Sequence, residues 1–271
     1  MTGTALRRAG NGRPLVLLHP LALSGAVWGR FAERLADHFD VLAPDARGHG
    51  DAAWDGAPFT TADLAADVVA LLDGLGIERA HVLGMSMGGS IAVELAAAYP
   101  GRVDRLVVAD GTAWYGADAP QVWAQRAERA VELPRPRQVP FQTDRWFTDG
   151  FVRTHHGEVR RVAGIFTATD SLAHAAACRA LGALDVRDRL SAITAPTLSV
   201  TGEEDYATPP EMGAAIAANV ADGVHRTVPG LRHLSLVERP DLAELVRAHL
   251  DGRPLPETGT ADCGCPAEEI A

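Results

Sequence analysis

The sequence predicts an α/β fold in which a mostly parallel sheet is flanked by helices and carries a helical cap insertion. Three observations predict it. Short apolar runs alternate with helical patterns in the first and last parts of the chain. The alternation stops between residues 114 and 188, and a glycine-flanked serine stands where a strand pattern meets a helix pattern. Repeated strand–helix units form parallel sheets covered by helices.

The first part of the chain carries the clearest alternation. Its apolar runs are continuous, as in strands that are buried on both faces, and Gly76 is a stop signal after the second helical pattern. We expect strands at 15–19, 40–44, 81–84 and 105–109, and helices at 28–36, 63–75 and 86–99.

Residues 114–188 show helical rather than strand patterns, interrupted by Pro134, Pro136 and Pro140. Strand–helix alternation then resumes, with strands expected at 197–201 and 225–228 and helices at 210–219 and 241–250. We therefore expect the following organisation: a first part of the core at 1–113, a helical cap at 114–188, a second part of the core at 189–252, and a flexible tail at 253–271.

Composition restricts the partners. The 271 residues carry a net charge of −10, which disfavours nucleic acid and anionic membranes. No apolar run is long enough to span a membrane and no signal peptide is recognisable, so we expect a cytoplasmic protein. All 25 basic residues are arginine, which leaves no lysine for Schiff-base chemistry. The sequence carries no signal for an oligomeric state.

The three cysteines predict neither a disulfide framework nor a metal site. Cys178 lies in an alanine-rich stretch and is expected to be a small buried side chain. Cys263 and Cys265 form one C-x-C pair in the tail, and a zinc site needs four ligands. We expect no metal and no cofactor.

Ser86 is the candidate nucleophile, in the segment Gly84-Met85-Ser86-Met87-Gly88. A serine on a sharp turn between a strand and a helix needs small residues two positions away on each side. The loop is too short for a phosphate-binding loop and has no lysine. The Met87 amide, at the start of the helix, can stabilise an oxyanion, and so can the amide of Leu21 after the first strand, because Pro20 has no N–H.

A serine hydroxyl needs a base, and an acid must orient that base. His233, after the last strand, is the expected base, whereas His49 in a glycine-rich turn is expected to be structural. Asp205, after the strand at 197–201, is the preferred acid. Asp110, at the end of an earlier strand, is the rival.

Taken together, these motifs resemble the α/β-hydrolase superfamily over nearly the whole chain. The residues that carry the resemblance are His19-Pro20 with Trp28 downstream, Asp45-Ala-Arg-Gly-His-Gly50, the Ser86 turn, Ala195-Pro-Thr, Gly202-Glu-Glu-Asp205 and His233. The resemblance implies an α/β-hydrolase fold and a Ser86–His233–Asp205 catalytic triad, but one fold hosts many activities.

A closer resemblance is to the 3-oxoadipate enol-lactonases of aromatic-acid catabolism. It rests on Trp123-Ala-Gln-Arg126, Arg145-Trp-Phe-Thr148, Ala176-Ala-Cys178, Leu184-Asp-Val-Arg-Asp188, Asp205-Tyr-Ala-Thr-Pro-Pro210 and His233-Leu-Ser-Leu-Val-Glu238. The chain departs from that family at His19-Pro20, Ala22, Tyr206 and Asp110-Gly111. The resemblance implies hydrolysis of a small-molecule lactone or ester through an acyl-enzyme.

An enol-lactone of that kind carries a carboxylate, which a cap arginine can bind bidentately. Arg126 and Arg145 are the candidates, with Trp123 and Trp146 as apolar walls. The alternative for these arginines is solvation or pairing with acids. Two other functions remain open: a carboxylesterase or carbon–carbon bond hydrolase acting on a ring-cleavage product, and a non-hydrolytic relative such as a lyase, a cofactor-free oxygenase or a receptor.

Overall fold

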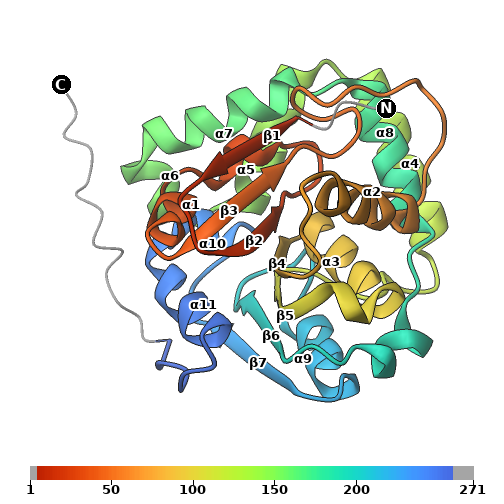
Figure 1. Cartoon of the computed structure of the whole chain (residues 1–271). Helices are drawn as coiled ribbons and strands as arrows, with labels where there is room; N and C mark the ends of the chain where they lie inside the picture. Colours follow the sequence, from red (N-terminus) through yellow and green to blue (C-terminus); the bar gives the residue numbers. More distant parts are fainter. Residues whose placement is uncertain (1–4, 259–271) are drawn as a thin grey trace.

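The computed structural model describes residues 5–258 and shows a sheet with helices on both faces, which confirms the predicted fold class (Figure 1). The strand order is β1-β3-β2-β4-β5-β6-β7, and every neighbouring pair is parallel except β1 with β3. The strands are β1 (Leu6–Ala9), β2 (Arg13–Leu18), β3 (Phe39–Pro44), β4 (Ala80–Met85), β5 (Val103–Ala109), β6 (Thr197–Gly202) and β7 (Gly223–Val228).

The helices fall into two groups. Those on one face of the sheet are α2 (Thr61–Gly74), α3 (Met87–Ala98) and α9 (Pro210–Asn219); those on the other are α1 (Gly29–Ala36), α10 (Ser235–Glu238) and α11 (Ala243–Leu250) (Figure 1). Between β5 and β6 lie the cap helices α4 (Ala119–Glu132), α5 (Arg135–Trp146), α6 (Asp149–Thr154), α7 (His156–Ala168) and α8 (Ser171–Gly182).

One strand is absent from the sequence prediction, and the predicted interruption at Pro140 is wrong. Residues 6–9 form an edge strand that the sequence does not reveal, because Arg7 and Arg8 are exposed and bind Asp45 and Asp40 instead of burying apolar surface. Pro140 lies inside α5 rather than interrupting it. The hydrogen bond that it removes is the one to the carbonyl of Pro136, an exposed residue near the start of the helix, where water can replace the bond.

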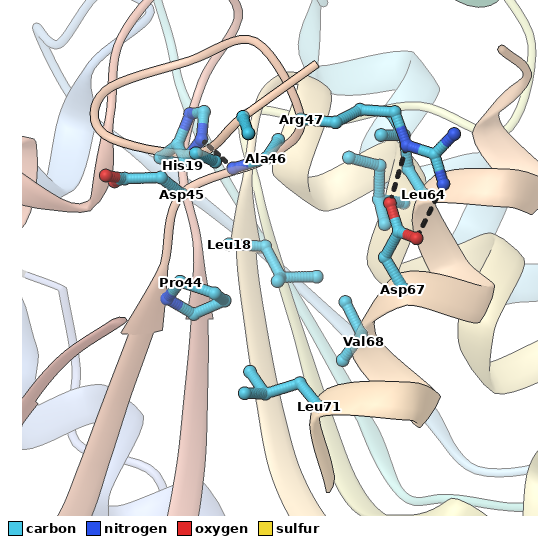
Figure 2. Close-up of a pocket in the computed structure, with 13 residues that line it drawn as sticks. Leu18, His19, Pro44, Asp45, Ala46, Arg47, Leu64, Asp67, Val68 and Leu71 are labelled. Atoms are coloured by element: carbon cyan, nitrogen blue, oxygen red, sulfur yellow. Dashed lines mark hydrogen bonds and ion pairs between the residues drawn. The ribbon is translucent and has the colours of Figure 1, made fainter. Parts of the chain in front are cut away.

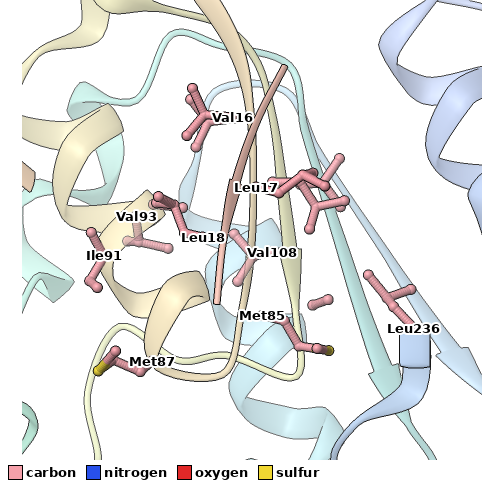
Figure 3. Packing of buried hydrophobic residues seen from close by; sticks show 14 of the residues in the cluster. Val16, Leu17, Leu18, Met85, Met87, Ile91, Val93, Val108 and Leu236 are labelled. Atoms are coloured by element: carbon pink, nitrogen blue, oxygen red, sulfur yellow. The ribbon is translucent and has the colours of Figure 1, made fainter. Parts of the chain in front are cut away.

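The core covers both faces of the sheet. Val16 and Leu18 of β2, Val108 of β5 and Ile91 of α3 are buried together, while Leu236 of α10 covers the opposite face (Figure 3). The carbonyl of Leu18 touches α3 where Gly88 has no side chain. This contact sets the distance between the sheet and the N-terminus of α3.

The cap is attached to the loop that follows β7. The amide of Leu234 donates to the carbonyl of Trp146 at 3.0 Å, and the amide of Thr148 donates to the Glu238 carboxylate at 3.0 Å. Arg232 donates to the carbonyls of Asp144 and Phe147 at 2.9 and 3.0 Å. The position of the C-terminal end of α5 therefore depends on this loop.

None of the helices within residues 5–258 is long and apolar enough to cross a membrane. Cys178 is buried, as expected, whereas Cys263, Cys265 and most of the expected flexible tail lie outside the described residues.

Replacing Gly88 by Ala tests the close contact between β2 and α3. A Cβ atom at Gly88 would lie 1.9 Å from the Leu18 carbonyl oxygen, so we expect a loss of about 1–3 kcal/mol in the free energy of unfolding. Gly164→Ala on the exposed face of α7 is the matched control, since nothing lies within 4 Å of its Cβ position. It should gain about 0.5–1 kcal/mol. Urea denaturation measures both, and a neutral Gly88→Ala would refute the contact.

Candidate active site

Ser86 lies on the turn that joins β4 to α3, with φ 57° and ψ −120°. Non-glycine residues rarely adopt this conformation, and they keep it only where the surroundings hold it. Here the Ser86 amide donates to the Ala109 carbonyl at 2.9 Å, and the Ser86 carbonyl accepts from the Ser90 amide at 3.0 Å. A Cβ atom at Gly84 would lie 2.0 Å from the Gly88 carbonyl oxygen. The expected need for glycines on both sides of Ser86 is therefore confirmed.

Ser86, His233 and Asp205 form a continuous hydrogen-bonded chain. The Ser86 Oγ lies 2.8 Å from His233 Nε2, and His233 Nδ1 lies 2.8 Å from Asp205 Oδ2. An ionised carboxylate only accepts, so Nδ1 carries the proton and Nε2 accepts from the Ser86 hydroxyl. This tautomer is the one that can take the proton of an attacking serine.

Asp205 is held by groups that favour its charged form. The amides of Ala207 and Thr208 donate to Oδ1 at 2.8 and 3.1 Å, and the Thr208 hydroxyl lies 2.8 Å from Oδ2. Burial opposes ionisation, but His233 and these donors together lower the pKa of Asp205. Asp205 is therefore ionised at neutral pH.

Asp110, the rival acid, makes no hydrogen bond to His233 within the described residues and instead connects the end of β6 to the start of α10. Its Oδ1 accepts from the Gly202 amide at 3.1 Å, and its Oδ2 accepts from the Ser235 amide and hydroxyl at 3.1 and 2.6 Å. Burial and the neighbouring charge of Asp205 raise the pKa of Asp110 well above its ordinary value. The geometry favours Asp205 as the partner of His233.

The two expected oxyanion donors are backbone amides near Ser86. Met87 is the first residue of α3, so its amide has no acceptor within the helix. Leu21 lines the same small cavity as Ser86 and His233, and its amide makes no hydrogen bond within residues 5–258. His19 shapes this turn, because its Nδ1 donates to the Pro20 carbonyl at 2.8 Å.

Behind this turn lies a separate cavity of about 40 Å³ between β2, β3 and α2 (Figure 2). Leu18, Val68 and Leu71 line it, and Ser86 does not. His19 Nε2 accepts from the Ala46 amide at 2.9 Å at one edge of the cavity. This cavity lies between the turn at Pro20–Leu21 and α2, and Leu21, Ser86, Asp205 and His233 do not line it.

His49, in the glycine-rich turn after β3, has the geometry of a structural residue. The side chain is buried, and its Nδ1 lies 3.1 Å from the Arg47 carbonyl in the same loop. Burial, and next the nearby His19, lower the pKa of His49 to about 3. It is therefore neutral at ordinary pH and makes no contact with the Ser86 hydroxyl.

All four expected cap residues reach the Ser86 cavity. It is a space of about 10 Å³, lined by Leu21, Ser86, Tyr115, His233, Trp123, Arg126, Arg145 and Trp146, with Pro20 at its edge. The Arg126 guanidinium lies 4.8 Å from the centroid of the Trp123 ring, within the range of a cation–π contact. The Trp146 ring packs against Phe166, which fixes the wall beside Ser86.

Arg126 and Arg145 form no ion pair within the described part of the chain. The Nε atom of Arg145 is buried and has no hydrogen-bond partner there. Burial and the charge of Arg126 lower the pKa of Arg145 to about 9, which still leaves it charged at neutral pH. Two cations without acidic partners therefore line the cavity that contains the Ser86 hydroxyl. The alternative that these two arginines pair with acids does not hold for the described residues.

Sequence reasoning missed Tyr115, His174 and Phe141. Tyr115 lines the Ser86 cavity and lies edge-on to Trp123, with 4.9 Å between ring centroids. His174 Nδ1 accepts from Arg135 at 2.6 Å, and Phe141 is 59% exposed on α5. The spacing of four residues between Phe141 and Arg145 indicates a shared helical face only if the helix continues through Pro140, and proline favours a break there. No group of three or more potential metal ligands occurs within residues 5–258.

With this geometry in place, comparison with known proteins identifies the family. The family model described as the alpha/beta hydrolase fold matches residues 13–240. The chain belongs to the α/β-hydrolase family. Two 3-oxoadipate enol-lactonases of Acinetobacter baylyi are each 31% identical to it, one over 83% of this chain and 84% of the relative, the other over 85% of each.

Solved structures with a similar fold include an enol-lactonase and an esterase. The crystal structure of the enol-lactonase from Burkholderia xenovorans has a TM-score of 0.86 at 31% identity, covering 92% of this chain and 97% of that one. An esterase from Thermogutta terrifontis has a TM-score of 0.85 at 27% identity and covers 92% of this chain and 93% of its own. The resemblance predicted from the motifs and the expected class, a hydrolase of ester bonds, are confirmed.

Asp205→Asn and Asp110→Asn form a matched pair of variants that shows which of the two buried acids supports His233. Because Asp205 fixes the tautomer of His233, its amide variant should lower kcat by about 10⁴-fold. Asp110 accepts from backbone and serine donors and does not contact His233, so Asp110→Asn should retain activity within about tenfold. Steady-state hydrolysis of an aryl ester measures both. A greater loss for Asp110→Asn would reverse the assignment.

Proposed function

We propose that this α/β-hydrolase cleaves a small lactone or ester that carries a carboxylate, in the manner of a 3-oxoadipate enol-lactonase. The observation that carries the proposal is the convergence of Arg126 and Arg145 on the cavity of Ser86 and His233. Arg–carboxylate pairs are strong and directional where the surroundings are partly dry. The relatives named as enol-lactonases support this substrate class.

The reaction begins with proton transfer. As the Ser86 Oγ bonds to the substrate carbonyl carbon, its proton passes to His233 Nε2, which lies 2.8 Å away. Asp205 stabilises the imidazolium through Nδ1 without itself becoming protonated. The carbonyl oxygen becomes an oxyanion between the amides of Leu21 and Met87, and such a donor contributes about 3–4 kcal/mol.

Collapse of this intermediate breaks the bond between the carbonyl carbon and the ring or ester oxygen. The leaving oxygen takes the proton from His233 Nε2. In a lactone the leaving group stays attached to the acyl-enzyme as a hydroxyl or enol. A water molecule then gives its proton to His233 and its oxygen to the acyl carbon, and Ser86 regains its proton as the free acid departs.

Arg126 and Arg145 act on the substrate rather than on the reacting bond. A carboxylate held between them fixes the carbonyl next to Ser86 while Trp123 and Trp146 exclude water. The repulsion between the two guanidinium groups contributes to the lowered pKa of Arg145, and a bound anion removes this repulsion.

A carboxylesterase of larger acids is the second candidate function. It is favoured by a further cavity of about 510 Å³ that adjoins these residues.

Ser86→Ala tests the chemistry. Without the Oγ atom no acyl-enzyme forms, so we expect kcat for lactones and aryl esters to fall by about 10⁶-fold. A panel of lactones and esters, run on the wild type and on this variant with circular dichroism to confirm folding, gives the result. Full turnover by Ser86→Ala would remove the proposal.

Arg145→Ala tests the substrate class. Loss of a charge-assisted contact of about 1.5–3 kcal/mol should lower the ratio of kcat/KM for an anionic lactone to that for a neutral ester by about 10- to 100-fold. Arg160→Ala, which removes a cap arginine that lines neither cavity, is the control and should leave the ratio unchanged. Equal losses on both substrates would show that Arg145 supports the cap without selecting the substrate.

A further inference from the structure

A large cavity leads away from the space beside Ser86. It has a volume of about 510 Å³ and shares four lining residues with the Ser86 cavity: Tyr115, Trp123, Arg126 and Arg145. The two spaces therefore adjoin at these residues, with Ser86 at the inner end. We call the larger space the cap groove.

Helices α4 and α5 supply most of the groove's lining. On α5, Arg137, Phe141 and Arg145 follow one another at intervals of four residues and so share one face. At 1.5 Å per residue, Arg137 and Arg145 are about 12 Å apart along the helix axis. On α4, Arg129 lies about one turn beyond Arg126, towards the Leu133–Pro134 connection that leads into α5.

The groove thus holds arginines at two depths. Arg126 and Arg145 lie beside Ser86, and Arg129 and Arg137 lie near the connection between α4 and α5. We call Arg129 and Arg137 the outer arginines. Both are exposed, and both line the groove.

None of the four groove arginines forms a hydrogen bond or an ion pair through its guanidinium within the part of the chain that the structure describes. Other arginines of the cap do: Arg161 pairs with Glu158, and Arg187 pairs with Asp185. Asp118 is the one acidic residue among the groove's lining in residues 5–258. In a chain of net charge −10, this groove concentrates positive charge.

One apolar side chain, Phe141, lies between Arg137 and Arg145 on α5, and other apolar side chains line the groove as well. Val122 is 51% exposed and Phe141 is 59% exposed, and both line the groove together with Leu133 and Met212. Large apolar side chains that remain exposed in a groove mark a surface that binds an apolar part of a ligand. Along α5 the groove therefore presents the cation of Arg145, then the apolar ring of Phe141, then the cation of Arg137.

We propose that the cap groove binds an elongated substrate with two anionic groups: one at Arg126 and Arg145, an apolar segment along Phe141, and a second anion at the outer arginines. The chemical class is an ester or lactone that carries two free carboxylates besides the bond that Ser86 attacks, with the far carboxylate at Arg129 and Arg137. This inference rests on the proposed function for the inner end and adds a second anion subsite to it.

Binding of unreactive diacids tests the subsite independently of hydrolysis. Isothermal titration calorimetry of the whole chain with linear dicarboxylates, from succinate to sebacate, is compared with monocarboxylates of the same chain lengths. We expect affinity for the diacids to pass through a maximum with length. At that length the diacid should bind at least tenfold more tightly than the matched monoacid. Equal affinity of diacids and monoacids at every length would overturn the proposal.

Three variants locate the second anion. In Arg137→Gln and Arg129→Gln, the ratio of diacid to monoacid affinity should fall towards one. Arg160→Gln, an equal charge change on the exposed face of α7, should keep the wild-type ratio. Thermal melting confirms that the variants fold. An unchanged ratio in both outer variants, or an equal drop in Arg160→Gln, would overturn the subsite.

The two proposals fail in different ways. If diacids bind with the expected ratio but Ser86→Ala retains turnover of every ester, the second anion subsite stands and the hydrolytic assignment of Ser86 falls. If Ser86 is needed for turnover but diacids show no advantage, the hydrolytic proposal stands and the outer arginines have no part in it.

Discussion

The turn at Ser86 is the constraint on which the rest of the site depends. A non-glycine residue is held at φ 57° because Gly84 and Gly88 let β4, α3 and β2 approach to distances that a Cβ atom would prevent. The same approach brings the Met87 amide to the end of the sheet. The packing of β4, α3 and β2 therefore fixes the position of the Ser86 hydroxyl, and the other groups of the site are placed around it.

The segment that carries His233 connects Ser86 to the cap. His233 bonds to Ser86, while the next residue, Leu234, donates to the carbonyl of Trp146 at the end of α5. The preceding residue, Arg232, binds the same end of α5. Asp110 connects this segment to the end of β6, which precedes Asp205, because it accepts from the amides of Ser235 and Gly202. The arginines of α5 are therefore placed relative to Ser86 by the segment that carries His233.

The sequence was sufficient for the fold, because continuous apolar runs and one strained serine turn have few structural solutions. It placed Asp205 and His233 in segments that follow strands, and because the ends of these strands meet at one edge of the sheet, the two side chains lie within hydrogen-bond distance. It could not show that Asp110 points at backbone amides rather than at His233, which depends on tertiary packing. It also could not reveal β1, whose arginines pair with acids from distant positions. It could not reveal the cap groove either. Proline ordinarily breaks a helix, but Pro140 lies inside α5, so Arg137, Phe141 and Arg145 share a face that the sequence does not predict.

The measurement that tests the central claim most directly is covalent labelling of the whole chain with a fluorophosphonate, followed by peptide mapping. An activated Ser86 beside His233 should give one adduct, on the peptide that contains Ser86, and His233→Ala should slow its formation by at least a hundredfold under the same conditions. An adduct on another residue, or labelling of Ser86 at the same rate without His233, would contradict the account.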